Sequence, residues 1–167
     1  MNEYKKISEL DSITWLELTQ DNDLIPIVDR SASITKKITV SELIGVASAQ
    51  VYIIEAETDC EVKEGVYYFR VPSKLNGRKL VGVAACCITA GTTGTMTIQI
   101  SNINTEHTLL STVLSIDSGE KDSLTAASQP VINTSYNTVL TGNQLRIDIL
   151  AIHSTPAKGL ILDMSFL

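Results

Sequence analysis

Residues 77–102 constrain the fold most, because they join two apolar segments through a short turn. The first segment, residues 80–88, is apolar on both alternating faces, which is typical of a strand that is covered on both sides. In the second segment, residues 95–101, apolar and polar side chains alternate strictly, as in a half-solvated strand whose side chains have a period of two. Residues 90–94 between them contain two glycines, and such a turn predicts a hairpin. We therefore expect the two strands to pair with each other at the centre of an all-β domain.

Short strand-like segments continue from residue 51 to the end of the chain. Turn signals rich in Gly, Asn, Asp and Pro separate them, and no helical period appears among them. This spacing predicts a mainly β fold in which residues 51–167, called the head domain below, form an antiparallel, jelly-roll-like β-sandwich. Beyond the central pair, the expected strands cover residues 51–57, 66–71, 109–116, 138–140, 145–151 and 160–167.

The first fifty residues have a different character. Their apolar side chains, Trp15 among them, are spaced irregularly between Ser, Asp and Thr. Residues 24–28 form a short extended run whose proline favours an edge strand or a non-sheet extension, and residues 34–39 form a second extended piece. Thr39 and Glu42 fit a capping box, which predicts one short helix.

A segment of this size has few residues with which to build a core of its own. Two interpretations remain open: a small subdomain that packs on the β-domain, or an anchor that becomes ordered only against another protein. The predicted domains are residues 1–50, the anchoring segment, and residues 51–167, the head domain.

Charge and composition argue against several classes of function. The 167-residue chain has a formal net charge of −6, and its Lys and Arg residues are scattered, so we expect no surface for nucleic acid. No secretory signal follows the charged N-terminus, and the longest apolar run is too short for a membrane span. We therefore expect a protein that is made in a cytoplasm. Its cysteines, which lack C-x-x-C spacing, are expected to be small hydrophobic side chains: Cys60, Cys86 and Cys87.

Three arrangements resemble catalytic or ion-binding sites only in part. Asp148, His153 and Ser154 would make a Ser/His/Asp set, but no G-x-S-x-G elbow is present. The acidic turn at residues 117–122 lacks the alternating oxygen donors and distal glutamate of an EF-hand loop. Residues 91–94 resemble a phosphate-binding loop, but no G-K-[ST] follows them. We expect no enzymatic activity, no metal and no cofactor.

Two further features bear on binding. Tyr52, Tyr68 and Tyr136 are candidates for carbohydrate contacts on a β-sandwich, and ordinary packing explains each of them at least as well. Residues 80–88 and 109–116 are apolar on both faces, whereas a two-sheet sandwich covers only the inner face of each sheet. The outer faces would form exposed apolar patches, and a symmetric oligomer is the simplest cover for them.

A set of short motifs, in this order, links the sequence to one class of proteins. In the N-terminal part these motifs are KISEL at 6–10, DLIPIVD at 23–29 and TKKITVSEL at 35–43. In the remainder they are VPSKLNG at 71–77, TAGTTGT at 89–95, IQISN at 98–102, LLST at 109–112, IDSGE at 116–120 and STPAKGL at 154–160. With these motifs, which span nearly the whole chain, the sequence resembles tailed-bacteriophage structural proteins of the head-fibre and tail-fibre type.

The resemblance implies a protein of the particle surface, attached by its N-terminal segment to the major capsid protein or another virion protein. It also implies a homotrimer, in agreement with the apolar excess. The short link at residues 45–50 favours a head fibre or capsid-decoration protein. The alternative is a tail-associated receptor-binding protein that contacts host surface glycans, and a polysaccharide depolymerase is disfavoured. The expected anchoring residues are Ile7, Leu10, Trp15, Leu24, Ile25, Ile27, Val28 and Leu43, and the expected ligand-facing loop residues are Thr92, Thr93, Asp117 and Glu120.

Overall fold

The computed structural model describes residues 24–29, 34–39 and 45–167. The chain divides after Gly45 into two units. Within the first unit, strands β1 (Leu24–Asp29) and β2 (Ile34–Thr39) pair antiparallel as a two-stranded sheet. Pro26 lies opposite Lys37 in this register. A two-stranded sheet accepts a proline because each strand keeps one edge that forms no ladder hydrogen bonds.

The predicted anchoring residues fall partly on this small sheet. Both extended pieces expected from the sequence are strands, and β1 carries Leu24, Ile25, Ile27 and Val28. The predicted short helix after Thr39 lies outside the described residues. The same holds for the other predicted anchoring residues, which are Ile7, Leu10, Trp15 and Leu43.

The second unit begins at Val46 and consists almost entirely of strands. Two short 3-10 helices, η2 (Ser73–Leu75) and η3 (Ser123–Thr125), interrupt them. Among the residues that the structure describes, no helix is long and apolar enough to cross a membrane. The strands are β3 (Ala47–Asp59), β4 (Lys63–Arg70), β5 (Leu80–Thr89), β6 (Met96–Asn102), β7 (His107–Thr108), β8 (Leu110–Thr112), β9 (Leu114–Ile116), β10 (Val131–Ile132), β11 (Gln144–Ala151) and β12 (Lys158–Phe166).

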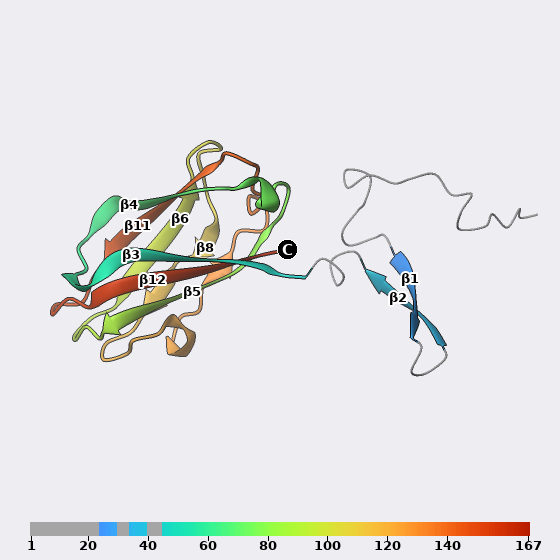
Figure 1. Ribbon diagram of the computed structural model, residues 1–167. Coiled ribbons are helices and arrows are strands. Elements are labelled where there is room, and N and C mark those ends of the chain that lie inside the picture. The colour runs from blue at the N-terminus through green and yellow to red at the C-terminus, as the bar shows by residue number, and fades with distance from the viewer. Residues whose placement is uncertain (1–23, 30–33, 40–44) are drawn as a thin grey trace, which may run out of the picture. The chain divides into compact units, whose positions relative to one another are not determined.

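These strands form two main antiparallel sheets. One has the order β3-β12-β5, and the other has the order β4-β11-β6-β7, with β9 also paired to β6. Figure 1 shows the two sheets as layers, and the short pair β8 and β10 forms a small sheet of its own. The protein is mainly β, and its second unit is an antiparallel, jelly-roll-like β-sandwich, as the sequence predicted.

The core lies between the two layers and follows the predicted alternation. Its largest contributions come from β6, β11 and β12, whose inward side chains are almost completely buried. Burial of one such side chain stabilises the fold by about 1.5–3 kcal/mol. These residues are Met96, Ile98, Ile100, Leu145, Ile147, Ile149, Leu160, Leu162, Met164 and Phe166, each 0–1% exposed.

The predicted central hairpin is wrong in its pairing. Strand β5 lies at the edge of the three-stranded sheet and pairs with β12, whereas β6 lies in the other sheet beside β11. The turn at residues 90–94 therefore carries the chain from one layer to the other. Side-chain alternation shows which face of a strand is buried, but it does not show which strand lies alongside, and here the partner of β5 is the C-terminal strand.

The apolar excess has two different explanations in the structure. Residues 109–116 are not one strand but two short ones, β8 and β9, so their apolar side chains are covered within the chain. Strand β5, by contrast, leaves Val81 and Ile88 44% and 42% exposed. Of the two segments, only strand β5 still suggests a cover by another chain.

Candidate functional site

The two loops predicted to face a ligand lie next to each other at one end of the sandwich. Hydrogen bonds join the loop between β5 and β6 to the loop after β9. The Thr93 N–H donates to Ser118 Oγ at 2.8 Å, and the Gly119 N–H donates to the Gly91 carbonyl at 2.8 Å. Thr92, Thr93, Asp117 and Glu120 are thus brought into one cluster, although they come from two distant segments.

A third loop, between β11 and β12, completes this cluster. Thr92 and Thr155 exchange N–H···O hydrogen bonds at 3.1 and 3.2 Å, and the Ser154 N–H donates to the Thr93 carbonyl at 2.8 Å. Thr92, Thr93, Ser154 and Thr155 are all exposed. The cluster is therefore a surface whose backbone is held in one conformation.

Two residues other than glycine have a left-handed backbone conformation in the described part of the chain. Thr93 has φ 62° in the loop cluster, and Glu106 has φ 58° in the turn between β6 and β7. This conformation costs an L-residue about 1–2 kcal/mol, and Thr93 is β-branched, for which it is least common. Such strain often accompanies binding sites.

The acidic side chains of the cluster are occupied with internal hydrogen bonds. Asp117 Oδ1 accepts from Thr95 Oγ1 at 3.2 Å, and its Oδ2 accepts from the Ala127 N–H at 2.8 Å. Glu120 Oε2 accepts from Thr125 Oγ1 at 2.8 Å. These carboxylates stabilise the loops. Within the described part of the chain, no three His, Cys, Asp or Glu side chains are placed to hold a metal ion.

His153 is buried under the loop cluster. Its Nε2 lies 3.1 Å from the Ile116 carbonyl oxygen, which requires Nε2 to carry the proton, and its Nδ1 has no partner within residues 45–167. Asp148 instead accepts from the Gly65 N–H at 2.7 Å and pairs with Arg146. The Ser/His/Asp set considered from the sequence therefore has no hydrogen-bond network.

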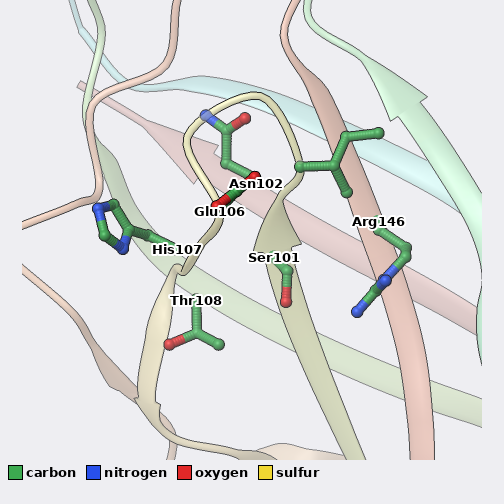
Figure 2. A pocket seen from close by; sticks show the side chains of 7 residues that line it. Ser101, Asn102, Glu106, His107, Thr108 and Arg146 are labelled. Carbon is green, nitrogen blue, oxygen red and sulfur yellow. The ribbon is translucent and has the colours of Figure 1, made fainter.

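A second candidate site lies on the outer face of the five-stranded sheet. Pairing registers align Tyr68, Arg146, Ser101 and Thr108 in one row across β4, β11, β6 and β7. A cleft of about 350 Å³ lies over this row, and Figure 2 shows Ser101 between Thr108 and Arg146. It is lined by Ser101, Asn102, Ile103, Glu106, His107, Thr108 and Arg146.

Arg146 is oriented by two carboxylates. Its Nε lies 2.9 Å from Asp148 Oδ1, and its Nη1 is paired with Glu64. Desolvation lowers the pKa of Arg146, but the hydrogen bond to Asp148 and the charges of Asp148 and Glu64 outweigh it and raise the pKa. The guanidinium is thus a fixed, permanently charged donor among the groups that line the cleft.

The sequence predicts only part of this cleft. The two-residue alternation of side chains places Arg146 on the polar face of β11 and Ser101 on the polar face of β6. Their adjacency depends on β11 lying beside β6, which sequence periodicity does not specify. Tyr68 and Tyr136 were named from the sequence as candidates for carbohydrate contacts, and both lie near the cleft: Tyr68 ends the polar row, and Tyr136 stacks on His107.

The cysteines remain thiols, and their environments differ. Cys60 and Cys87 are buried and share an S–H···S hydrogen bond, which together with burial raises the pKa of Cys87. Cys86 is half-buried on the opposite face of β5, and desolvation raises the pKa of its thiol.

Together these features define an antiparallel β-sandwich with a strained loop cluster at one end and a polar cleft on one sheet. No protein-family model, curated protein or solved structure matches the chain.

Proposed function

We propose that this protein is a structural component of a tailed-bacteriophage particle, a head fibre or capsid-decoration protein. Residues 1–50 attach it to the major capsid protein or another virion protein, and the β-sandwich is displayed on the particle surface as a trimeric knob. The proposal draws on the sequence resemblance and on the division of the chain into two units.

The observation that carries the proposal is the contrast between the two units. The sandwich has an extensive core made by its own strands, from Val51 to Phe166. The only strands described in the first unit are β1 and β2, of six residues each. An isolated two-stranded sheet is marginally stable at best in water. A hairpin with the sequence LIPIVD on one strand is stabilised most by packing against a partner protein. The free energy of that packing offsets the conformational entropy that the segment loses when it becomes ordered.

Deletion of residues 1–45 is expected to abolish incorporation into particles and to leave the sandwich folded. The cut at Gly45 preserves β3, which begins at Ala47. Phage particles assembled with either form would be purified and probed for the protein, and circular dichroism of the truncated chain would check its fold. Incorporation of a folded truncated chain at the full-length level would refute the anchor.

The outer face of the β3-β12-β5 sheet is the proposed trimer contact. Tyr52, Ile161 and Cys86 form one cross-strand row on this face. Tyr52 is 70% exposed, and Val81 and Ile88 add apolar surface on β5. An aromatic ring with neighbouring small and branched side chains is typical of the centre of an interface.

Tyr52→Arg is therefore expected to convert a trimer into a monomer without unfolding the chain. The full-length protein should have three times the chain mass of 18.1 kDa in light scattering, and the variant should have the mass of one chain, because a charge would be buried without a partner. Tyr68→Arg, a matched change on the other sheet, should leave the trimer intact. A monomeric wild type at two concentrations would eliminate this contact.

A tail-associated receptor-binding protein that contacts host surface glycans is the second candidate function. The observation that favours it is the polar cleft beside Tyr68 and the stacked rings of His107 and Tyr136. A purified sandwich that binds bacterial cells would support this candidate, whereas a protein that serves only to decorate the capsid would show no such binding.

A further inference from the structure

We propose that the cleft over Ser101, Thr108 and Arg146 binds a neutral sugar ring of a surface glycan. This inference gives the second candidate function a site and a ligand class, and a capsid-mounted knob would carry the same cleft. The site differs from the loop cluster that the sequence suggested. Its volume of about 350 Å³ is at the small end of the range for small-molecule sites, which suits one or two sugar rings.

The cleft offers hydrogen-bonding groups that the protein itself does not use. Among the described residues, no hydrogen bond is made by the Ser101 or Thr108 hydroxyl or by the Glu106 carboxylate. Arg146 uses Nε and Nη1 for Asp148 and Glu64, which leaves the donors of Nη2 for a ligand. Adjacent donors and acceptors of this kind match the vicinal hydroxyls of a sugar.

The scaffold of the cleft is fixed before any ligand arrives. The buried Asn102 donates through Nδ2 to Asn143 Oδ1 at 3.0 Å and accepts from the Asn104 N–H at 3.1 Å. Arg146 is held by its two carboxylates. Preorganised groups lose little conformational entropy on binding, which matters for a small polar ligand with little apolar area to bury.

One aromatic ring lies on the same face as the polar row. Tyr68, 53% exposed, stands at the β4 end of this row. His107 and Tyr136 are stacked with ring centroids 3.6 Å apart, but His107 pairs with the buried Asn102, and Figure 2 shows its ring pointing away from Ser101 and Arg146. The apolar C–H face of a pyranose would therefore pack on Tyr68 while its hydroxyls bond the polar side chains.

The charges around the cleft favour a neutral ligand. The carboxylates of Glu64 and Asp148 pair with the guanidinium of Arg146. A third carboxylate, that of Glu106, lines the same cleft. An anionic sugar or a phosphate would find its one attractive partner neutralised and would be repelled by Glu106.

The conformation of Glu106 supports a binding role independently. Its φ of 58° is one that glycine or asparagine adopts with less strain. Keeping glutamate in this turn places a carboxylate at the rim of the cleft at the expense of local strain, as is common at binding sites.

Titration of the full-length, ¹⁵N-labelled protein with glucose, galactose and N-acetylglucosamine tests the proposal, with glucuronate and inorganic phosphate as anionic probes. At least one neutral sugar should shift the amide signals of Ser101, Glu106 and Thr108, with a dissociation constant on the order of 1–10 mM. The proposal is overturned if no neutral sugar shifts these signals at about 50 mM. It is equally overturned if glucuronate or phosphate binds more tightly, or if the shifts cluster elsewhere.

Two variants and a control exclude a merely structural effect. Ser101→Ala should weaken binding about tenfold, and Glu106→Gly should do the same while the melting temperature stays equal or rises, because glycine relieves the strained φ. Tyr52→Ala, on the other sheet, should bind the monosaccharide like the wild type. Unchanged binding by Glu106→Gly would contradict the proposal. Because these titrations use free protein, their failure would leave particle attachment untouched, and failed particle attachment would leave the cleft intact.

Discussion

Gly159→Ala is expected to lower the free energy of unfolding of the sandwich by roughly 2–5 kcal/mol. Gly159 is the second residue of the core strand β12, lies at the register shift between Lys158 and Leu160, and has φ +64°. A Cβ there would lie 2.7 Å from Ile88 Cγ1, 3.0 Å from Ala56 Cα and 3.2 Å from the Ala56 carbonyl oxygen. Two of these atoms are backbone, so relief requires β3 to move away from β12. The left-handed conformation adds its own penalty for any residue with a Cβ.

Gly77→Ala is the matched control for this prediction. Gly77 has a similar φ of +75°, but no atom lies within 4 Å of the position that its Cβ would take. Gly77→Ala should lower the free energy of unfolding by only about 1 kcal/mol, which is the cost of the left-handed conformation alone. Urea unfolding of both variants, followed by circular dichroism, measures the difference. Equal losses in the two variants would show that the contact between β3 and β12 is not as close as described.

Gly91→Ala should produce the second large effect, and its cause is a single side chain. Gly91 does not have a positive φ, so alanine fits its backbone, but the new Cβ would lie 2.3–2.8 Å from Nδ1, Cγ and Cβ of His153. The ring is 1% exposed and hydrogen-bonded to Ile116, so it has no open direction in which to turn. We expect a loss of roughly 1–3 kcal/mol, as for overpacking in a core.

The double variant separates this steric cause from a general need for glycine in the loop. In a His153→Ala background, the additional change Gly91→Ala should cost almost nothing, because the ring that it would meet is gone. The coupling energy from such a cycle should therefore reach about 1–3 kcal/mol. Strictly additive losses would show that Gly91 is required for another reason. The three-loop cluster should also lose its arrangement in Gly91→Ala, visible as shifted amide signals at Thr92 and Thr155.

The sequence predicted the burial of the strands better than their arrangement. The alternation in Met96, Ile98 and Ile100 indicated the inner face of β6, and Leu162 and Met164 did so for β12; all five are fully buried. Local side-chain chemistry carries that information, because the alternation of a strand is a property of the strand itself. From these local patterns the sequence correctly predicted a mainly β, antiparallel sandwich.

Pairing between strands required information that local patterns lack. The hairpin expected at residues 77–102 failed because β5 pairs with the distant β12, at contacts such as Leu162 with Ala85. For the same reason the cleft was not predicted: Arg146 and Ser101 are 45 positions apart in the chain and become neighbours only through the β11–β6 register. The loop residues Thr92 and Asp117 were named singly, and the structure unites their loops in one cluster, where Asp117 is already used by Thr95 and Ala127.

The most direct test of the proposed particle role is quantitative mass spectrometry of purified phage particles from the host in which the protein is made. A virion component anchored by its N-terminal segment should be present as the full-length chain, in a fixed ratio to the major capsid protein that persists through gradient purification. A chain that is found in the lysate but absent from purified particles would contradict the proposed function.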